Sequence, residues 1–597
     1  MAEPVVLQLD LKRCFQWYAA GEHQQLAEHF LHVLDHFSNM VYLNESSVSG
    51  TVTPFLSAFL TLFTQPDFIV AKKDAPAFLS CQTLISNLVA MTPIGNTDAY
   101  LEIVGAQPDN FIKVLTLYSA RNHVHIDRDQ LFEADPGLAS LWYSLYCEIY
   151  KTGLVRDDVV RNLQEHLRYR AKNMILSAGL AVPYFASTYV DGQVDRIAKP
   201  LLNALVQSSN RMPPLRQPNP GKIAVICDYW YASHSVYRNY AEFVRQLQGF
   251  YHLTLIHVLT AREELDVGMF DEVKRLEIRA EKLDVEWLLE NRFQLIYYPD
   301  VGMTDPSILL ANLRLAPIQI CSPGHSVSTW GAEIDYYVSG AEVEIPERPE
   351  RNYSERLILL PGLGVIHNKP RYQRRGTAAG STGVTINCPW SAHKMCHRFL
   401  STLRTLVDSA EVPLRLRIFP GTGISQHNGH RAFLKDLYAV LGEKAKIEVL
   451  AQLPYADYMA YLEQGDLTLD SYHFAGCNTV ADSLFVGKPI VVWQGDKWYN
   501  RIGPAMLRRV GLDTLIATSE EEYLAIALRL IRQPEERSAL GRYLESVDLD
   551  TTLFSNNEAP LFREAVDDLI DRHEELLASG SKKALRLENG RLISSTE

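Results

Sequence analysis

The chain has 597 residues, more than one hydrophobic core usually serves, so we expect two or three domains. Hydrophobic residues make up 47% of the sequence and charged residues 22%, as in an ordinary folded protein. The net charge of -13 argues against nucleic-acid binding, because such proteins usually present a basic face, although a local basic patch could be hidden in the average.

The N-terminal sequence MAEPVVLQLDLKRCF lacks the basic and apolar regions of a secretory signal. No apolar run approaches the length of a membrane span, so we expect none. The eight cysteines are widely spaced and form no CxxC pair, which favours reduced, buried thiols and offers no zinc signature. These features predict a cytoplasmic protein.

Residues 1–215 are predicted to form an all-helical domain. The segments QLAEHFLHVLDHF and VRNLQEHLRYRAKNMIL carry apolar residues three and four positions apart, which is typical of amphipathic helices. No clean 34-residue repeat is evident, so tetratricopeptide repeats are not predicted. The segment QSSNRMPPLRQPNPGK, rich in Pro, Asn and Ser, is then typical of a linker.

Two α/β lobes are predicted to follow, at 216–375 and 376–597. In the first, strand-like runs such as KIAVICDYW, HLTLIHVL and FQLIYYPD alternate with helical stretches such as SVYRNYAEFVRQLQ. After a second linker, NKPRYQRRGTAAGSTG, the alternation resumes with VTINCPW, LRLRIFPG and PIVVWQG. This alternation predicts doubly wound parallel sheets, with ligands bound beyond the carboxyl ends of the strands. A helical tail closes the chain, and its last ~20 residues are expected to be frayed.

Two candidate site histidines follow predicted strands of the first lobe. His234, in ASHSVYRNY, lies where a loop enters a helix; the alternative is a helix capped by Ser233 with an incidental histidine. His325, in CSPGHSVST, follows Gly324, which permits close approach of the backbone, and precedes Ser and Thr donors. The alternative for this second segment is an ordinary polar loop.

Lys394, in NCPWSAHKMCHRFL, is predicted near the start of a helix. A lysine there opposes the helix dipole, unless it shares a bound anion such as a phosphate with the helix terminus. The alternative is a solvated surface lysine.

The segment AGCNTVADSLFVGKPIVV in the second lobe combines a helix start with a carboxylate. Asn478 and Thr479 are predicted to cap the helix, whose first N–H groups can bind an anion. Asp482, about one turn further on, could accept hydrogen bonds from a ribose. The alternative is an ordinary capped helix packed under the strand PIVV.

Two DxD sequences could in principle hold a metal. DLD at 548–550 and DRD at 127–129 lie in predicted helical regions rather than at strand ends, so structural roles are favoured for both. The sequence contains no GxxxxGK[ST] loop and no GxSxG motif.

Several segments together resemble glycosyltransferase family 41, the enzymes related to O-linked N-acetylglucosamine transferase. They are LRLAPIQICSPGHSVST, AGCNTVADSLFVGKPIVV and RIGPAMLRRVGL, and their order matches that family. The chain resembles above all the bacterial cytoplasmic N-glycosyltransferases that modify adhesins, which also have a helical N-terminal domain. The segment ASHSVYRNYAEF is similar to the region around the active-site histidine of that branch.

The resemblance implies a GT-B fold of two Rossmann-like lobes with an N-terminal all-α domain. It implies an inverting, metal-independent transferase without a cofactor, which moves a hexose from a UDP-sugar to an acceptor protein such as an adhesin, on Asn side chains. It places His234 at the acceptor, His325 near the sugar and phosphates, and Lys394 at the diphosphate. The further donor-site residues that it implies are Thr422 near the sugar, Gly476, Asn478 and Thr479 at the diphosphate-binding helix start, and Asp482 at the ribose.

Other functions stay open at this point. O-linked transferases carry a histidine shortly before the His234 position, where this chain has Tyr229-Trp230-Tyr231, which favours the N-linked branch or a different acceptor. The alternatives are O-glycosylation of Ser or Thr, transfer to a glycan or small molecule, and a non-catalytic protein that only binds a UDP-sugar. The presence of Lys394, Asn478 and Asp482 argues against the non-catalytic protein.

Overall fold

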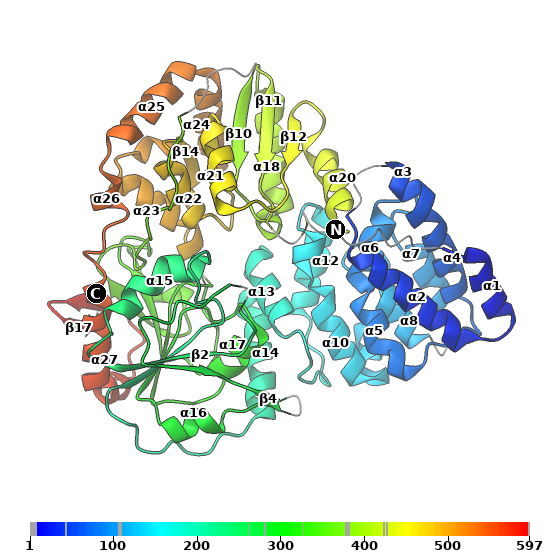
Figure 1. Cartoon of the computed structure of the whole chain (residues 1–597), viewed down its shortest axis with the longest axis horizontal. Helices are drawn as coiled ribbons and strands as arrows, with labels where there is room; N and C mark the ends of the chain where they lie inside the picture. Colours follow the sequence, from blue (N-terminus) through cyan, green and yellow to red (C-terminus); the bar gives the residue numbers. More distant parts are fainter. Residues whose placement is uncertain are drawn as a thin grey trace. The chain divides into compact units, whose positions relative to one another are not determined.

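The computed structural model describes residues 9–41, 45–105, 110–261, 263–279, 282–325, 327–376, 383–421, 424 and 428–594. The chain forms two compact units, and each is built from three separate stretches. Unit 1 contains residues 1–194, 390–407 and 418–452, and unit 2 contains residues 195–389, 408–417 and 453–597. In the sequence colours of Figure 1, the stretches of unit 1 are blue to cyan and then yellow.

The N-terminal part of unit 1 is helical, as predicted, and no strand occurs among its described residues up to 194. Its main helices are α1 (Leu11–Ala19), α2 (His23–Ser38), α4 (Thr53–Phe63), α5 (Ala75–Ser80), α6 (Gln82–Ala90), α7 (Asp98–Gly105), α8 (Phe111–Leu117), α9 (Arg128–Ala134), α10 (Pro136–Tyr146), α11 (Ile149–Thr152), α12 (Asp157–Arg168) and α13 (Ala181–Tyr189). Buried aromatic rings hold the first helices together; Phe30 of α2, for example, packs edge-on against Phe59 of α4 at 5.0 Å.

Two later stretches of the chain complete unit 1. They contribute the 3₁₀ turn η4 (Ala392–Lys394), the helices α18 (His397–Ser409) and α20 (His430–Leu441), and the strand β12 (Lys446–Val449). A buried ion pair joins the helical part to α20, since Arg121 Nη1 lies 2.8 Å from Asp436 Oδ2. Lys435 of the same helix donates to the carbonyl oxygen of Ala90 at 3.0 Å.

Unit 2 contains a nine-stranded sheet with the order β17-β16-β9-β8-β7-β6-β1-β2-β3. All neighbouring strands run parallel except the C-terminal hairpin β16-β17. The strands are β1 (Lys222–Ile226), β2 (His252–His257), β3 (Glu272–Arg275), β6 (Leu295–Tyr298), β7 (Ile318–Cys321), β8 (Tyr336–Gly340), β9 (Arg356–Leu360), β16 (Leu585–Glu588) and β17 (Arg591–Ser594).

The prediction of a frayed C-terminus is wrong for residues up to 594. The hairpin β16-β17 extends the sheet beyond β9, and the apolar side chains of Leu585, Leu587 and Leu592 are buried. These leucines alternate with more exposed residues, which is the pattern of a strand with one face on the core.

The second sheet contributes to unit 2 the strands β10 (Val384–Cys388), β11 (Leu414–Ile418), β13 (Leu467–Leu469), β14 (Ile490–Trp493) and β15 (Ile516–Ala517). The pairs β10-β13, β13-β14 and β14-β15 are parallel, as predicted for a doubly wound lobe. The helices of unit 2 are α14 (Asp195–Ser209), α15 (Ser235–Arg245), α16 (Glu286–Asn291), α17 (Asp305–Ala311), α21 (Tyr455–Gln464), α22 (Asn478–Phe485), α23 (Ile502–Arg509), α24 (Glu520–Arg532), α25 (Pro534–Ser546), α26 (Leu549–Thr552) and α27 (Pro560–Ala578).

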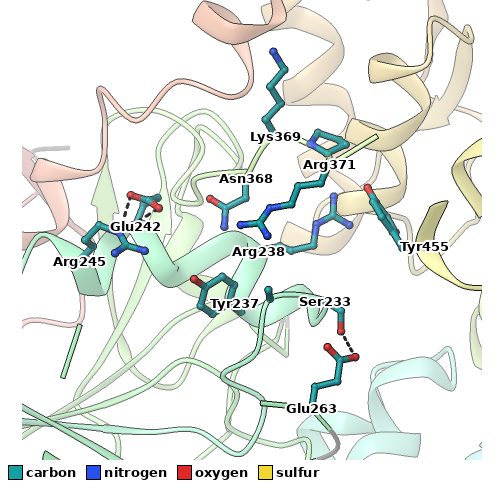
Figure 2. A pocket seen from close by; sticks show the side chains of 12 residues that line it. Ser233, Tyr237, Arg238, Glu242, Arg245, Glu263, Asn368, Lys369, Arg371 and Tyr455 are labelled. Carbon is teal, nitrogen blue, oxygen red and sulfur yellow. Dashed lines mark hydrogen bonds and ion pairs between the residues drawn. The ribbon is translucent and has the colours of Figure 1, made fainter. Parts of the chain in front are cut away.

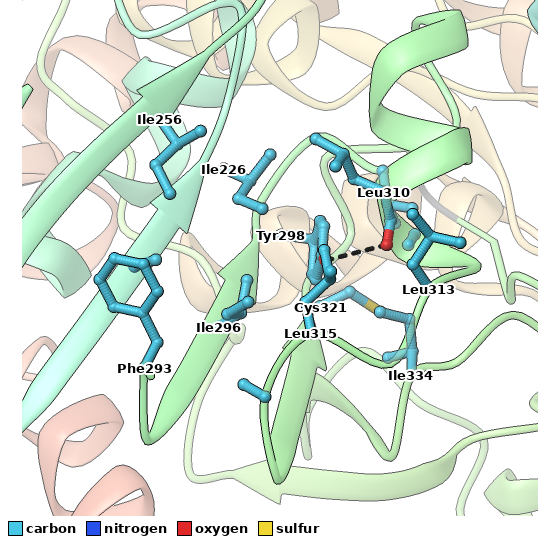
Figure 3. Close-up of a cluster of buried hydrophobic side chains, with 14 of the residues drawn as sticks. Ile226, Ile256, Phe293, Ile296, Tyr298, Leu310, Leu313, Leu315, Cys321 and Ile334 are labelled. Atoms are coloured by element: carbon cyan, nitrogen blue, oxygen red, sulfur yellow. Dashed lines mark hydrogen bonds between the residues drawn. The ribbon is translucent and has the colours of Figure 1, made fainter. Parts of the chain in front are cut away.

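One core of unit 2 lies under the strands that carry the candidate site (Figure 3). Ile226, Ile256 and Ile296 project from the neighbouring strands β1, β2 and β6. Tyr298 is also fully buried, and its hydroxyl donates to the carbonyl oxygen of Leu310 at 3.2 Å. Each such apolar side chain contributes about 1.5–3 kcal/mol on burial, so this core fixes where the strands end.

Helix α14 falls within the predicted helical segment 1–215, but its contacts place it in unit 2. The buried Lys199 donates to the carbonyl oxygen of Ser328 at 3.2 Å, and Asn203 donates to that of Thr329 at 2.8 Å. The three-domain division at residues 215 and 375 stays a prediction. Within the described residues, no helix is both long and apolar enough to cross a membrane.

Candidate active site

The carboxyl ends of three adjacent strands of unit 2 are tied together. The backbone N–H of Asp228, after β1, donates to Asp300 Oδ2, after β6, at 3.1 Å. The hydroxyl groups of Tyr297 on β6 and Ser322 after β7 lie 2.7 Å apart. Burial, reinforced by the charge of Asp228, raises the pKa of Asp300 to about 7. These contacts fix the carboxyl ends of the three strands relative to one another, so the loops after β1 and β7 start from fixed positions.

His234 lies in the loop after β1 and is itself the N-cap residue of α15. Its Nδ1 accepts a hydrogen bond from the backbone N–H of Val236 at 3.3 Å, and its ring stacks on Tyr229 at 4.4 Å. The cap by Ser233 considered from the sequence is wrong, because the Ser233 hydroxyl donates to Glu263 at 2.5 Å. Since Nδ1 is an acceptor, the neutral ring carries its proton on Nε2.

His325 lies in the turn after β7 and is buried. Gly324 is required beside it, because a Cβ at that position would lie 1.7 Å from the carbonyl oxygen of Pro299. The residues after the turn are anchored by Glu355, whose carboxylate accepts from the Ser328 hydroxyl at 2.7 Å and from the Thr329 N–H at 2.8 Å. The Gly-His turn is thus held on both sides.

The predicted anion-binding helix start is the N-terminus of α22. The N-cap residue is Cys477, and no side chain caps the helix, so the predicted capping by Asn478 and Thr479 is wrong. The side-chain oxygen of Asn478 instead lies 3.3 Å from Nδ1 of His367, and Thr479 Oγ1 is buried without a hydrogen-bond partner in the structure. Gly476 leaves room for that hydroxyl, since a Cβ there would lie 2.1 Å from it.

Asp482 is buried on α22, with 2% of its surface exposed, and has two partners. Arg238 of α15 forms an ion pair with its Oδ1 at 2.8 Å, and the Tyr455 hydroxyl donates to the same oxygen at 2.7 Å. Burial disfavours the charged guanidinium, but the carboxylate of Asp482 outweighs this effect and raises the pKa of Arg238. The predicted ribose ligand is therefore already engaged in this structure.

Arg238 and Tyr455, the two partners of Asp482, both line a cavity of about 470 Å³ (Figure 2). It is lined by the turn before His234, by α15, by the segment from Asn368 to Arg371, and by Tyr455. Four cationic side chains line it, namely Arg238, Arg245, Lys369 and Arg371, against the two carboxylates Glu242 and Glu263. Because Arg238 and Tyr455 also bind Asp482, two of the side chains that line the cavity contact the predicted ribose carboxylate.

One predicted donor ligand falls in unit 1. Lys394 ends the 3₁₀ turn η4 just before α18, half-buried, so it lies near a helix start as predicted. Thr422 lies outside the described residues. Their predicted roles, like those of the candidate residues in unit 2, stay predictions.

The carboxylates of both DxD sequences have structural partners. Asp548 caps α26 and Asp550 pairs with Lys369 at 2.7 Å. Asp127 caps α9, and Asp129 accepts from the Tyr169 hydroxyl at 2.7 Å. These contacts agree with the structural roles favoured from the sequence.

Three residues of the site were missed from the sequence. Arg238 follows His234 by one helical turn, so the spacing within ASHSVYRNYAEF could have placed both on one face of the helix. Nothing in the local sequence marks Tyr455 or His367. Burial and the charge of Arg238 lower the pKa of His367 to about 3, which keeps this partner of Asn478 neutral.

Comparison with solved structures identifies the fold. The O-GlcNAc transferase from Thermobaculum terrenum, solved as a mutant with one lysine replaced by methionine, matches with a TM-score of 0.58 and 17% identity, over 90% of this chain and 100% of that one. The fold is therefore that of the GT-B glycosyltransferases, as predicted.

No family model matches the chain, but similar sequences are found among curated proteins. Two proteins named UDP-glucose:protein N-beta-glucosyltransferase, from Actinobacillus pleuropneumoniae serotypes 5b and 7, are each 23% identical over 87% of this chain and 89% of their own. A probable UDP-N-acetylglucosamine-peptide N-acetylglucosaminyltransferase SPINDLY from Solanum lycopersicum is 25% identical over 42% of this chain and 28% of its own. The resemblance to glycosyltransferase family 41 carried by the sequence motifs is thereby confirmed.

Proposed function

We propose that this protein is an inverting glycosyltransferase that moves a hexose, with glucose the first candidate, from a UDP-sugar to Asn side chains of a protein acceptor. The observation that carries the proposal is the extent of the likeness to the two N-beta-glucosyltransferases, which covers 87% of the chain. The likeness to the SPINDLY protein covers 42%, so it supports a sugar-nucleotide site without favouring its acceptor.

The reaction proposed is attack of the acceptor nitrogen on the anomeric carbon, with UDP as the leaving group. Negative charge grows on the diphosphate as the bond to the sugar breaks. The first N–H groups of α22 and the unpartnered Thr479 hydroxyl are suited to bind that charge, and the family resemblance adds the ammonium of Lys394. Each such preorganised contact typically contributes about 3–4 kcal/mol of transition-state stabilisation. With these groups on the diphosphate, we propose that no metal is needed.

His234 is proposed to orient the acceptor. In its neutral form Nε2 is the hydrogen-bond donor of the ring, because Nδ1 accepts from the backbone of α15. A donor at this position suits the oxygen of an Asn side-chain amide, whose nitrogen then faces the sugar. We accordingly assign His234 a binding role rather than that of a general base.

The acceptor proposed is a polypeptide such as an adhesin, modified in the cytoplasm. The cavity beside His234 carries four cationic side chains against two carboxylates, in a chain whose net charge is -13. Three of these cations form ion pairs, Arg238 with Asp482, Arg245 with Glu242 and Lys369 with Asp550, so the cavity offers a polypeptide acceptor charges of both signs.

The test is transfer to defined peptides. The purified full chain is incubated with UDP-glucose and one peptide that contains Asn, Ser and Thr, and with the same peptide in which Asn is replaced by Gln. We expect mass spectrometry to find one added hexose on Asn and none on the Gln peptide. Hexose on Ser or Thr would refute Asn specificity, and UDP binding without any transfer would support the non-catalytic alternative.

A further inference from the structure

An aromatic cage surrounds the residue next to Lys394. His393 is buried in the turn η4, and the rings of Tyr150, Phe185 and Tyr189 meet it edge-on. Their centroids lie 4.7, 5.3 and 4.4 Å from that of His393, with interplanar angles of 64°, 71° and 74°. All three rings come from the helical N-terminal part of unit 1, which has no role in the proposed chemistry so far.

The cage is itself rigidly held. Tyr150 of α11 stacks on Phe185 of α13 at 4.7 Å, and Phe185 packs against Tyr189 at 4.6 Å. Phe185 and Tyr189 are buried in the helical core, whereas 39% of Tyr150 is exposed. Offset and edge-to-face ring pairs stabilise a structure beyond the area that they bury, so the rings define one position for His393.

Backbone contacts hold the other side of Lys394. The N–H of His397, the first residue of α18, donates to the carbonyl oxygen of Leu154 at 2.9 Å. The Nδ1 of His397 lies 3.0 Å from the carbonyl oxygen of Val155. Leu154 and Val155 lie directly after α11, the helix that carries Tyr150. Contacts with residues 150–155 of the helical part therefore hold the chain on both sides of Lys394.

Lys394 is also the one charged group of this turn. Burial lowers the pKa of His393 well below its usual value, and the charge of Lys394 acts in the same direction. The neutral imidazole brings no second cation beside the ammonium, so an anion at this turn would be bound by the lysine.

We propose that Tyr150, Phe185 and Tyr189 of the helical N-terminal part are positioning residues that fix Lys394. This inference rests on the proposed function, in which Lys394 binds the donor diphosphate. The aromatic cage touches neither substrate; it acts through His393 on the direction of the neighbouring side chain. A misplacement of such a group by about 1 Å can cost on the order of 100-fold in rate.

Tyr150→Ala is the variant of choice, because this ring is half-exposed and its loss leaves the buried core intact. Tyr438→Ala is a matched control, since Tyr438 lies on α20 of the same unit and is 40% exposed against 39% for Tyr150. We expect Tyr150→Ala to lower kcat about 10- to 100-fold while the KM for UDP-glucose changes much less. Tyr150→Phe keeps the ring, so its kcat should be close to that of the wild type. Tyr150→Ala and Tyr438→Ala should unfold at similar temperatures.

A double-mutant comparison separates this inference from the proposed function. If Tyr150 acts through Lys394, Tyr150→Ala should have no further effect on turnover in a Lys394→Ala background. An equal loss from Tyr150→Ala in both backgrounds, or an equal loss from Tyr150→Ala and Tyr438→Ala, would overturn the inference and leave the proposed function standing. Wild-type turnover of Lys394→Ala would instead overturn the role of the lysine itself.

Discussion

Replacing Asp482 with Asn should destabilise unit 2 markedly. Asp482 is 2% exposed, and its ion-pair partner Arg238 has 14% of its side chain exposed. Removing one partner of a buried pair leaves the other charge uncompensated, which typically costs about 3–5 kcal/mol. Arg238 keeps some contact with solvent, and the new amide oxygen can still accept from Tyr455, so we expect a loss at the lower end, about 3 kcal/mol.

An exposed ion pair of similar length is the control. Lys369 and Asp550 lie 2.7 Å apart, but 53% and 61% of their side chains are exposed. Solvent screens such a pair, so Asp550→Asn should cost less than about 1 kcal/mol. The measurement is the midpoint of urea denaturation, with the slope checked to confirm that the same surface is exposed in each variant.

The comparison can refute the reasoning directly. If Asp482→Asn and Asp550→Asn shift the midpoint equally, burial of the Arg238–Asp482 pair does not stabilise the protein. Combining Asp482→Asn with Arg238→Met removes both charges and should recover part of the loss, because no unpaired charge then stays buried. If the double variant is no more stable than Asp482→Asn, the loss of stability comes from packing rather than from an unpaired charge.

The same carboxylate should contribute to nucleotide binding. Loss of a hydrogen bond to a charged group typically costs about 1.5–3 kcal/mol, so Asp482→Ala should weaken UDP binding in calorimetry by about that amount. The measurement has to be made below the unfolding temperature of the variant, since Asp482 also holds Arg238 and Tyr455. An unchanged dissociation constant would leave Asp482 with a structural role alone.

Three other measurements test the site and the core. Turnover should survive excess EDTA, and a loss that manganese restores would contradict the metal-free mechanism. Burial lowers the pKa of His166 from 6.5 to about 3, so the stability that the neutral ring contributes is fully present above pH 6.5 and is lost as the pH falls towards 3, with a loss of about 2 kcal/mol at pH 5. His166→Phe should therefore flatten the dependence of the urea midpoint on pH in this range. An unchanged dependence would contradict the assignment. Gly324→Ala should lower kcat/KM at least about tenfold, because its Cβ would displace the His325 turn from Pro299, whereas Gly268→Ala, with its nearest atom at 3.6 Å, should behave as wild type in the same steady-state assay.

The fold could be predicted because its signals are local. Strand-like apolar runs separated by helical stretches predicted parallel sheets, and the candidate histidines were found because they follow strands. The division into units could not be predicted in this way. It depends on contacts such as that of Lys435 with Ala90, which join residues far apart in the sequence and have no local signature.

The site shows the same limit. The helix start at Asn478 was predicted, but its capping was not predicted correctly, since the Asn478 side chain lies against His367 instead. Arg238 was overlooked because its partner Asp482 lies 244 positions away. A buried ion pair between distant helices depends on the finished fold, whereas a histidine at a strand end depends on its neighbours in the chain.

The interleaving of the two units has a consequence for synthesis of the chain. Residues 1–194 leave the ribosome first, but the unit to which they belong also needs residues 390–407 and 418–452. At ~5–20 residues per second, synthesis of those stretches is complete roughly 10–50 s after residue 194 has been made. During this interval Phe185 and Tyr189, which pack on His393 in the folded protein, lack that ring. The nascent helical part therefore exposes apolar surface that chaperones can bind, and a gene split at residue 194 would divide a folding unit rather than separate two domains.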